Sequence, residues 1–370
     1  MQTAGAVHRY EALDGLRGVA ALTVMFGHFG LLLDIFWLQN GLLAVDTFFV
    51  MSGFVIAYSY GDRLGNGMPA WAYLYRRIVR LYPMFVIALL IGAVIMCYGT
   101  YRGVIQYPTP DLLRGVALNM LYIPFLNAVP VSFEVGQVFP ADPPAWSLFF
   151  EMLASGAFLL LFGLRLRSLV WVSALCYVAL IAAGLYYARG ADWIDIHNGY
   201  YTSNLFGGLP RVAFGFSSGV LLHAVTRDGI GGWRIRALIG RIPCPSFLLY
   251  AAALAILLFP RTAHGLYPLL AMATVVPALV FFGANIRPRS ELEMNVATFL
   301  GWISYPIYCL HYPVVRLVIF IRGGEPGSGY LLMAVSAAVT LALAMALTRW
   351  YEEPLRAALS GRLFLKPAPK

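Results

Sequence analysis

The chain has 370 residues, of which 60% are hydrophobic and 12% are charged, and its mean hydropathy is +0.74. An ordinary soluble domain is about half apolar and a quarter charged, so this composition excludes one and indicates a polytopic membrane protein. The net charge of +9 does not indicate a nucleic-acid partner. The positive residues lie between apolar runs, where membrane orientation explains them.

Ten apolar runs are long enough to cross about 30 Å of hydrocarbon. They predict an all-α membrane protein with about ten transmembrane helices around a cavity. We expect one membrane domain over residues 1–350 and a short basic tail over 351–370. A shorter run at 112–126 is closed by prolines and predicts a re-entrant or interfacial helix. The ten runs are 16–37, 41–60, 81–98, 146–164, 168–188, 204–225, 246–260, 266–284, 296–320 and 330–349.

The basic residues are distributed unevenly between the two sides of these runs. With the N-terminus in the cytoplasm, eighteen of the 26 Lys and Arg residues lie on the inside, five lie outside and three lie within the runs. This positive-inside bias predicts that both termini are cytoplasmic, in a bacterial inner membrane. The cysteines show no metal-ligand spacing, so neither disulfides nor a metal site are expected; they are Cys97, Cys176, Cys244 and Cys309.

The stretch Tyr10–Phe29, which leads into the first run, carries an arginine at the end of its polar entry and a histidine in its apolar interior. Arg17 and His28 are eleven residues apart, which places them on one helical face about 16 Å apart. An ionisable group inside a bilayer is costly and usually marks function. The alternative is a structural histidine that bonds to a neighbouring helix.

The second run begins near Asp46 and contains the small polar pair Ser52 and Gly53. A glycine here allows a ligand or another helix backbone to approach closely. Both explanations, a functional cavity and helix packing alone, fit this pair.

Three arginines, Arg76, Arg77 and Arg80, lie within about one helical turn at the start of the third run. Guanidinium groups bind phosphates or carboxylates through paired planar donors, so this cluster is a candidate anion site. The alternative is a role in orientation and in contacts with anionic lipids.

The proline-rich and tyrosine-rich segment 99–145 is a candidate cap over a cavity or an acceptor-binding surface. The fourth run then opens at Trp146, and its residues Ser147 and Glu151 share a helical face because they are four positions apart. A carboxylate inside a membrane needs a histidine or arginine partner from another helix. A purely structural Glu–Arg pair is the alternative.

The ninth run places Ser304, Tyr308 and His311 on one continuous helical face. Two prolines, Pro306 and Pro313, are expected to disturb its backbone and to mark a cavity wall. Two further buried cations, Arg211 and Arg316, lie within runs, and the sequence does not identify the partner of Arg211.

Together these segments resemble the acyltransferase-3 family of integral membrane acyltransferases, which modify bacterial surface and secreted glycans. The resemblance covers nearly the whole chain and rests on six motifs in order. They are LDGLRGVAAL with its Arg-x10-His spacing, VDTFFVMSGFVI, YRRIVRLYP, AWSLFFE, ISYPIYCLHYP and YEEP. Some members carry a further hydrolase-like domain outside the membrane, which this chain is not expected to include.

The resemblance implies transfer of an acyl group, commonly acetyl, from a coenzyme A thioester to a carbohydrate hydroxyl. The partners would be acyl-CoA, a carbohydrate acceptor and the bilayer, with acetyl-CoA as donor substrate and no bound cofactor. His28 is the expected general base, because imidazole titrates near neutrality. Arg17 and Glu151 are expected to assist it, and Arg76, Arg77 and Arg80 to bind the donor phosphates. The remaining expected cavity residues are Asp46, Ser52, Trp146, Ser147, Tyr308 and His311.

Two other functions fit the same features. A proton-coupled transporter or exporter would also have about ten helices with buried His, Arg and Glu residues, although it would favour paired inverted halves, which the sequence does not show. A non-catalytic polysaccharide-assembly protein with a decayed site is the third, and the intact Arg17, His28 and Glu151 argue against it.

Overall fold

A computed structural model describes residues 10–35, 41–131, 134–188, 193–227, 242–258, 265–323 and 329–361. Within these ranges nine helical segments are long and apolar enough to cross a membrane, which confirms an all-helical polytopic membrane protein. The first half contains α1 (Glu11–Leu32), α2 (Leu42–Gly65), α3 (Ala70–Tyr101), α4 (Thr109–Met120), β1 (Pro130–Val131), β2 (Glu134–Val135), η2 (Pro143–Ala145) and α5 (Trp146–Leu161). The second half contains α6 (Leu166–Tyr186), η3 (Leu205–Gly207), α7 (Gly208–Arg227), α9 (Pro245–Leu257), α10 (Leu266–Ala273), α11 (Val275–Asn285), α12 (Glu291–Ile321), α13 (Gly329–Leu347), η4 (Thr348–Glu352) and α14 (Glu353–Gly361).

The seventh expected span, 246–260, corresponds to a shorter helix in the structure. Its helix, α9, has 13 residues and rises about 20 Å, less than the hydrocarbon thickness. The expected run 266–284 is also interrupted, because α10 ends at Ala273 and α11 begins at Val275. Pro277 has no N–H to donate to the carbonyl of Ala273, which accounts for a break at this point.

Helix α12 continues unbroken through Pro306 and Pro313. Its start lies five residues before the expected 296, because Ser290 and Glu293 form a reciprocal capping box there. The two prolines therefore do not break the helix. Pro306 does line the cavity described in the next subsection.

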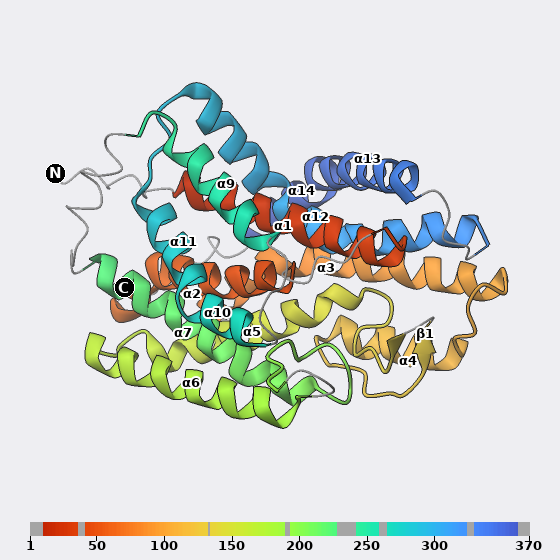
Figure 1. Cartoon of the computed structure of the whole chain (residues 1–370), viewed down its shortest axis with the longest axis horizontal. Helices are drawn as coiled ribbons and strands as arrows, with labels where there is room; N and C mark the ends of the chain where they lie inside the picture. Colours follow the sequence, from red (N-terminus) through yellow and green to blue (C-terminus); the bar gives the residue numbers. More distant parts are fainter. Residues whose placement is uncertain are drawn as a thin grey trace.

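The segment 99–145, called the cap below, lies at the end of the molecule where α3 finishes, and none of its described residues lines the cavity reported in the next subsection. Its short helix, α4, covers Thr109–Met120, where a re-entrant or interfacial helix over 112–126 was expected. Strands β1 and β2 form a two-stranded antiparallel sheet that the sequence did not predict. Figure 1 shows α4 and β1 beside each other at this end, away from the start of α3.

Helices α1 and α12 lie side by side along much of their length (Figure 1). Gly18 of α1 faces the backbone of Leu300, and Gly301 of α12 faces Asp14, so a Cβ atom at either glycine would collide with the other helix. Gly53 of α2 is packed in the same way against the Phe216 carbonyl of α7. Small residues thus allow close helix approach, as is common in membranes, and Gly53 serves packing.

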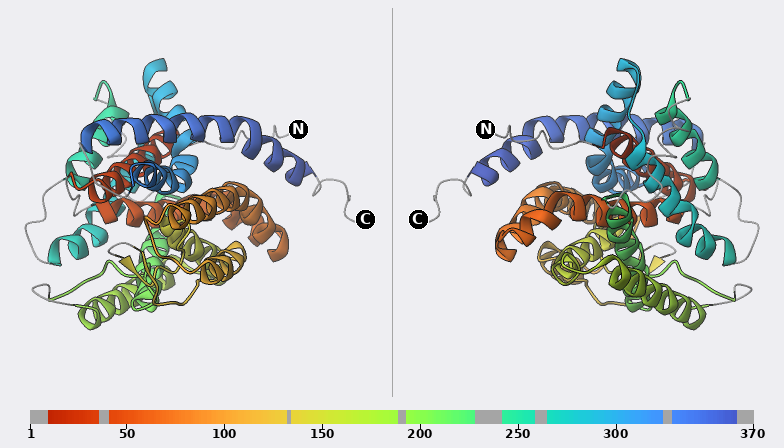
Figure 2. Two further views of the ribbon diagram at one scale, coloured as in Figure 1. Left: turned by 90° about the vertical axis from the view of Figure 1, so that its right-hand side faces the viewer. Right: turned by 90° about the vertical axis from the view of Figure 1, so that its left-hand side faces the viewer.

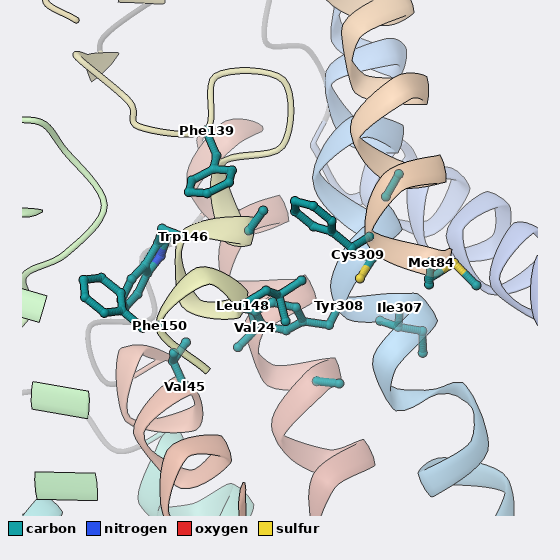
Figure 3. Packing of buried hydrophobic residues seen from close by; sticks show 14 of the residues in the cluster. Val24, Val45, Met84, Phe139, Trp146, Leu148, Phe150, Ile307, Tyr308 and Cys309 are labelled. Atoms are coloured by element: carbon teal, nitrogen blue, oxygen red, sulfur yellow. The ribbon is translucent and has the colours of Figure 1, made fainter. Parts of the chain in front are cut away.

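The centre of the molecule is a cluster of buried aromatic and aliphatic side chains from α1, α2, α3, α5 and α12. Figure 3 shows Tyr308 of α12 in the same part of this cluster as Leu148 of α5 and Val24 of α1. Trp146 and Phe150 pack edge to face on the opposite side of α5, with ring centroids 5.9 Å apart. The four cysteines are free, and only Cys309 is fully buried.

The last helices form one long rod, in which α13 passes through the π-helical turn η4 into α14. Both views in Figure 2 show this rod, in dark blue, running across the other helices. Residues 351–361 of the expected tail are therefore helical, and 362–370 lie outside the described residues. Nine of the basic residues used to predict the membrane orientation also lie outside the described residues, so that orientation stays a prediction. They are Arg9, Arg189, Arg234, Arg236, Arg241, Arg261, Arg362, Lys366 and Lys370.

Candidate active site

A cavity of about 530 Å³ lies between α1, α2, α3, α5, α12 and the η4–α14 segment. Its walls carry both charges and apolar side chains. The charged and hydroxyl-bearing residues that line it are Asp14, Arg17, Ser52, Arg77, Arg80, Ser147, Glu151, Thr298, Ser304, Tyr305, Tyr308, Thr348, Glu352, Glu353 and Arg356. Seven of the twelve residues expected at the site are therefore present in one cavity.

Glu151 has the cationic partner that its position in a span requires. Its Oε1 accepts a 2.8 Å hydrogen bond from Nη2 of Arg77 and a 3.2 Å bond from the Ser52 hydroxyl. The Arg77 Nε also donates to Ser155 Oγ at 3.2 Å. Because both Arg77 and Ser155 are buried, this network fixes one wall of the cavity.

Arg80, one turn further along α3, is the guanidinium that remains available to a ligand. It is exposed to the cavity, and within the described part of the chain it forms neither a hydrogen bond nor an ion pair. Arg17, Arg77 and Arg356 all lie near enough to add positive potential. Such an arrangement of guanidinium groups is suited to a phosphate-bearing anion.

The neighbours of Arg80 are held in place by carboxylates. Arg17 pairs with Asp14 at 3.3 Å, and Arg356 pairs with Glu352 at 3.1 Å. Arg76 is not among the cavity-lining residues, since it lies about 100° around the helix from Arg77 and is only partly buried. The three expected arginines therefore separate into two at the cavity and one outside it.

Two of the hydroxyl groups that line the cavity contact each other. Ser147 Oγ and Tyr308 Oη lie 2.6 Å apart, and each also lies within hydrogen-bond distance of the Pro144 carbonyl oxygen, at 3.0 and 3.2 Å. Because each hydroxyl has one proton, one of them donates to the other and the second donates to the carbonyl. Phe48 packs edge to face against the Tyr308 ring at 5.4 Å. Ser304 lies one turn before Tyr308 and also lines the cavity.

Asp46 and Trp146 do not line the cavity, and both contact Arg211 instead. Asp46 accepts hydrogen bonds of 2.7 and 3.2 Å from Arg211, and both side chains are fully buried. The Arg211 guanidinium also lies 5.3 Å from the Trp146 ring. This pair supplies the partner of Arg211 that the sequence could not identify.

The two intramembrane histidines meet each other. Nδ1 of His28 lies 2.9 Å from Nε2 of His311, and the rings stack with centroids 5.0 Å apart. His311 is fully buried, while His28 is partly exposed. Neither lines the cavity; the Tyr308 ring does line it, and its centroid lies 6.0 Å from that of the His311 ring.

Sequence reasoning missed the contribution of the final helical segment. Glu352, Glu353 and Arg356 line the cavity mouth, and Trp302 donates a 2.9 Å hydrogen bond to Glu353. Their charges made residues 351–361 look like a tail, although the YEEP motif was a signal that this segment belongs with the site. Tyr305, whose hydroxyl donates to the Leu81 carbonyl at 2.5 Å, gave no separate signal.

Comparison with known proteins places the chain among acyltransferases. A family model described as an acyltransferase domain matches residues 10–349. The acyltransferase MdmB of Streptomyces mycarofaciens is 27% identical over 92% of this chain and 87% of its own length. Protein 2 in the picA locus of Rhizobium radiobacter is 32% identical over 40% of this chain and 81% of its own length.

A third relative is named for its acceptor. The peptidoglycan O-acetyltransferase OatA of Listeria monocytogenes is 26% identical over 93% of this chain, but over only 55% of its own length. No solved structure gives a significant match. The family match spans nearly all the transmembrane helices that build the cavity, so the chain belongs to the acyltransferase-3 family and is a multi-pass membrane acyltransferase of the O-acetyltransferase type.

Proposed function

We propose that this acyltransferase moves an acetyl group from acetyl-CoA to a carbohydrate hydroxyl, with His28 as the general base. The observation that carries the proposal is the cavity lined by Arg17, Arg77, Arg80 and Arg356, whose lining also includes Tyr308, one helical turn before His311 of the His28–His311 pair.

The arginine-rich mouth is suited to the donor. Coenzyme A carries several phosphate oxygens, and Arg80 forms no ion pair with a carboxylate among the described residues, although Glu151 and Glu352 lie near enough to act on it. Arg17 and Arg77 add charge but also hold Asp14 and Glu151. Since coenzyme A is made in the cytosol, donor binding here would place the start of α3 and both termini on the cytoplasmic side, in agreement with the positive-inside bias.

The first helix connects the donor to the base. Arg17 lines the cavity, and His28 lies about 16 Å further along α1. The thioester arm would extend along this helix past Ser147 and Tyr308. Arg17 would hold the donor or stabilise charge that develops on it, and Glu151 and Ser52 would hold a substrate hydroxyl.

The chemical step is then transfer of the acetyl group from the thioester sulfur of acetyl-CoA to the hydroxyl oxygen of the acceptor. His28 takes the proton of the acceptor hydroxyl while that oxygen attacks the thioester carbonyl carbon. The carbon–sulfur bond breaks as the tetrahedral intermediate collapses, and His28 returns the proton to the departing thiolate. No redox or metal chemistry is required for this balance.

The acceptor class follows from a relative and not from the cavity. The name of the Listeria protein includes peptidoglycan O-acetylation, and a carbohydrate hydroxyl is the corresponding nucleophile. We therefore assign the acceptor to surface or secreted glycans as a class.

The test is transfer of labelled acetyl from acetyl-CoA by the purified full-length protein in lipid nanodiscs, with glycan fragments as acceptors. We expect release of coenzyme A and acetylated glycan, and loss of both in His28→Ala. His223→Ala is the matched control, because His223 is also partly buried but lies on α7 beside a different cavity. An active His28→Ala protein would exclude the base assignment, and glycan movement without thioester consumption would indicate a transporter.

A further inference from the structure

The hydrogen bonds around the histidine pair determine where its protons lie. Nδ1 of His311 is 3.0 Å from the carbonyl oxygen of Ile307, one turn earlier on α12. A carbonyl oxygen can only accept, so this nitrogen carries a proton and donates it. In a neutral imidazole the other nitrogen, Nε2, then holds a lone pair.

That lone pair faces His28. Nε2 of His311 is 2.9 Å from Nδ1 of His28, so Nδ1 of His28 must donate. The Val24 carbonyl is a second acceptor near the His28 ring. His28 therefore has its proton on Nδ1, and its Nε2 is left as the unprotonated, basic nitrogen.

The alternative, in which His311 is doubly protonated, is disfavoured by its surroundings. His311 is fully buried, and no carboxylate oxygen in the described ranges lies within ion-pairing distance of either ring. The groups that surround the pair are the aromatic rings of Phe29, Tyr308 and Tyr312 and the helix carbonyls. A buried positive charge without a counterion would be costly, so the neutral pair is favoured.

We propose that His311 is a positioning residue that holds His28 in the Nδ1–H tautomer, so that Nε2 of His28 is the nitrogen that takes the acceptor proton. This inference rests on the proposed role of His28 as the base. In water histidine prefers the other tautomer, with the proton on Nε2, and that form could not accept a proton at Nε2. Helices α1 and α12, which carry the two rings, pack closely against each other, and Gly18 and Gly301 permit that approach ten residues before the histidines.

The first test compares His311→Gln with His311→Leu. A glutamine amide oxygen can occupy the place of Nε2 and accept from His28, whereas leucine fills the space without an acceptor. We expect His311→Leu to lower kcat about 10- to 100-fold, part of the 10²–10⁴ that a general base contributes, and to leave the KM for acetyl-CoA unchanged. His311→Gln should restore most of kcat, and the acidic limb of the pH–rate profile should change only in the leucine variant.

Equal loss in the two variants would reduce His311 to a packing residue, and full activity in His311→Leu would overturn the proposal. These outcomes are distinct from failure of the proposed function, in which wild-type protein does not consume acetyl-CoA or His28→Ala remains active. His223→Leu controls for loss of an imidazole elsewhere.

A second measurement observes the tautomers in the wild-type protein itself, and a variant serves only to assign the signals. Nitrogen NMR of ¹⁵N-histidine-labelled wild-type protein should show two imidazoles in the Nδ1–H form, and both signals should disappear in the His28→Ala, His311→Ala double variant. Signals that report Nε2–H at these two positions would overturn the proposal.

Discussion

Arg77 and Glu151, which are 74 positions apart in the chain, are joined by a 2.8 Å ion pair at the wall of the cavity. Arg77 is almost completely buried, and Glu151 is partly accessible from the cavity. A buried pair of this kind contributes little net stability, but loss of one partner leaves an uncompensated charge. Its value to the enzyme is that it fixes the direction of two side chains beside Arg80.

Glu151→Gln should destabilise the protein by removing the counterion of Arg77. Loss of one partner of a buried pair costs about 3 kcal/mol, which thermal unfolding in detergent should detect. Replacing both residues by methionine should recover much of that stability without recovering activity. If Glu151→Gln and the double replacement were equally unstable, the ion pair would not be the cause.

Arg80→Ala should raise the KM for acetyl-CoA about 10- to 100-fold, because a charge-assisted contact to a phosphate contributes about 1.5–3 kcal/mol. The KM for the acceptor should stay constant. Arg227→Ala is the matched control, since Arg227 is an exposed arginine that pairs with Asp62 away from this cavity. Arg76→Ala should resemble that control, because Arg76 does not line the cavity. Equal loss of donor and acceptor binding in Arg80→Ala would indicate a structural role for Arg80.

The hydroxyl pair of Ser147 and Tyr308 can be tested by a double-mutant cycle. Ser147→Ala and Tyr308→Phe each remove one side of the 2.6 Å contact, and each should cost about 1 kcal/mol of stability. The double variant should cost less than the sum, because the shared bond is counted in both single variants. Additive effects in thermal unfolding would show that each hydroxyl depends on the Pro144 carbonyl instead.

The parts of this site that the sequence predicted are those fixed by helical spacing. Ser304, Tyr308 and His311 share a face of α12 because they are three or four residues apart, and Glu151 required an arginine or histidine because it lies in a span. Spacing along one helix does not say which helices touch. The pairing of Asp46 with Arg211 joins residues 165 positions apart, and it depends on how α2 packs against α7.

The same limit explains the other differences. The sequence placed His28 in the cavity with Arg17, since the two share a face, but the cavity is lined by Arg17 and by Tyr308 of another helix and not by His28. Residues 351–361 have a charged sequence with little apolar signal, so their helix was predicted as a tail. Only the continuation of α13 through η4 brings Glu352 and Arg356 to the mouth.

Asp142, in the cap immediately before α5, offers a prediction about pH. Its side chain is fully buried, and within the described part of the chain neither carboxylate oxygen has a hydrogen-bond partner. Burial raises the pKa of this carboxyl well above its usual range, and Arg316 only partly opposes that effect. The folded protein therefore holds this proton more tightly than the unfolded chain does.

The free energy of unfolding should fall as the pH rises above about 3.9, the pKa of an unfolded aspartate. Between that value and the higher folded pKa, the unfolded state binds fewer protons, and the decline is about 1.4 kcal/mol per pH unit for one group. Asp142→Asn removes this group, so its stability relative to wild type should increase across that range. Asp111→Asn is the control, because Asp111 of α4 is partly exposed and pairs with Arg114. Unfolding midpoints measured in detergent from low to neutral pH should diverge between wild type and Asp142→Asn only; parallel curves would mean that Asp142 is ionised in the folded protein and is stabilised there by Arg316.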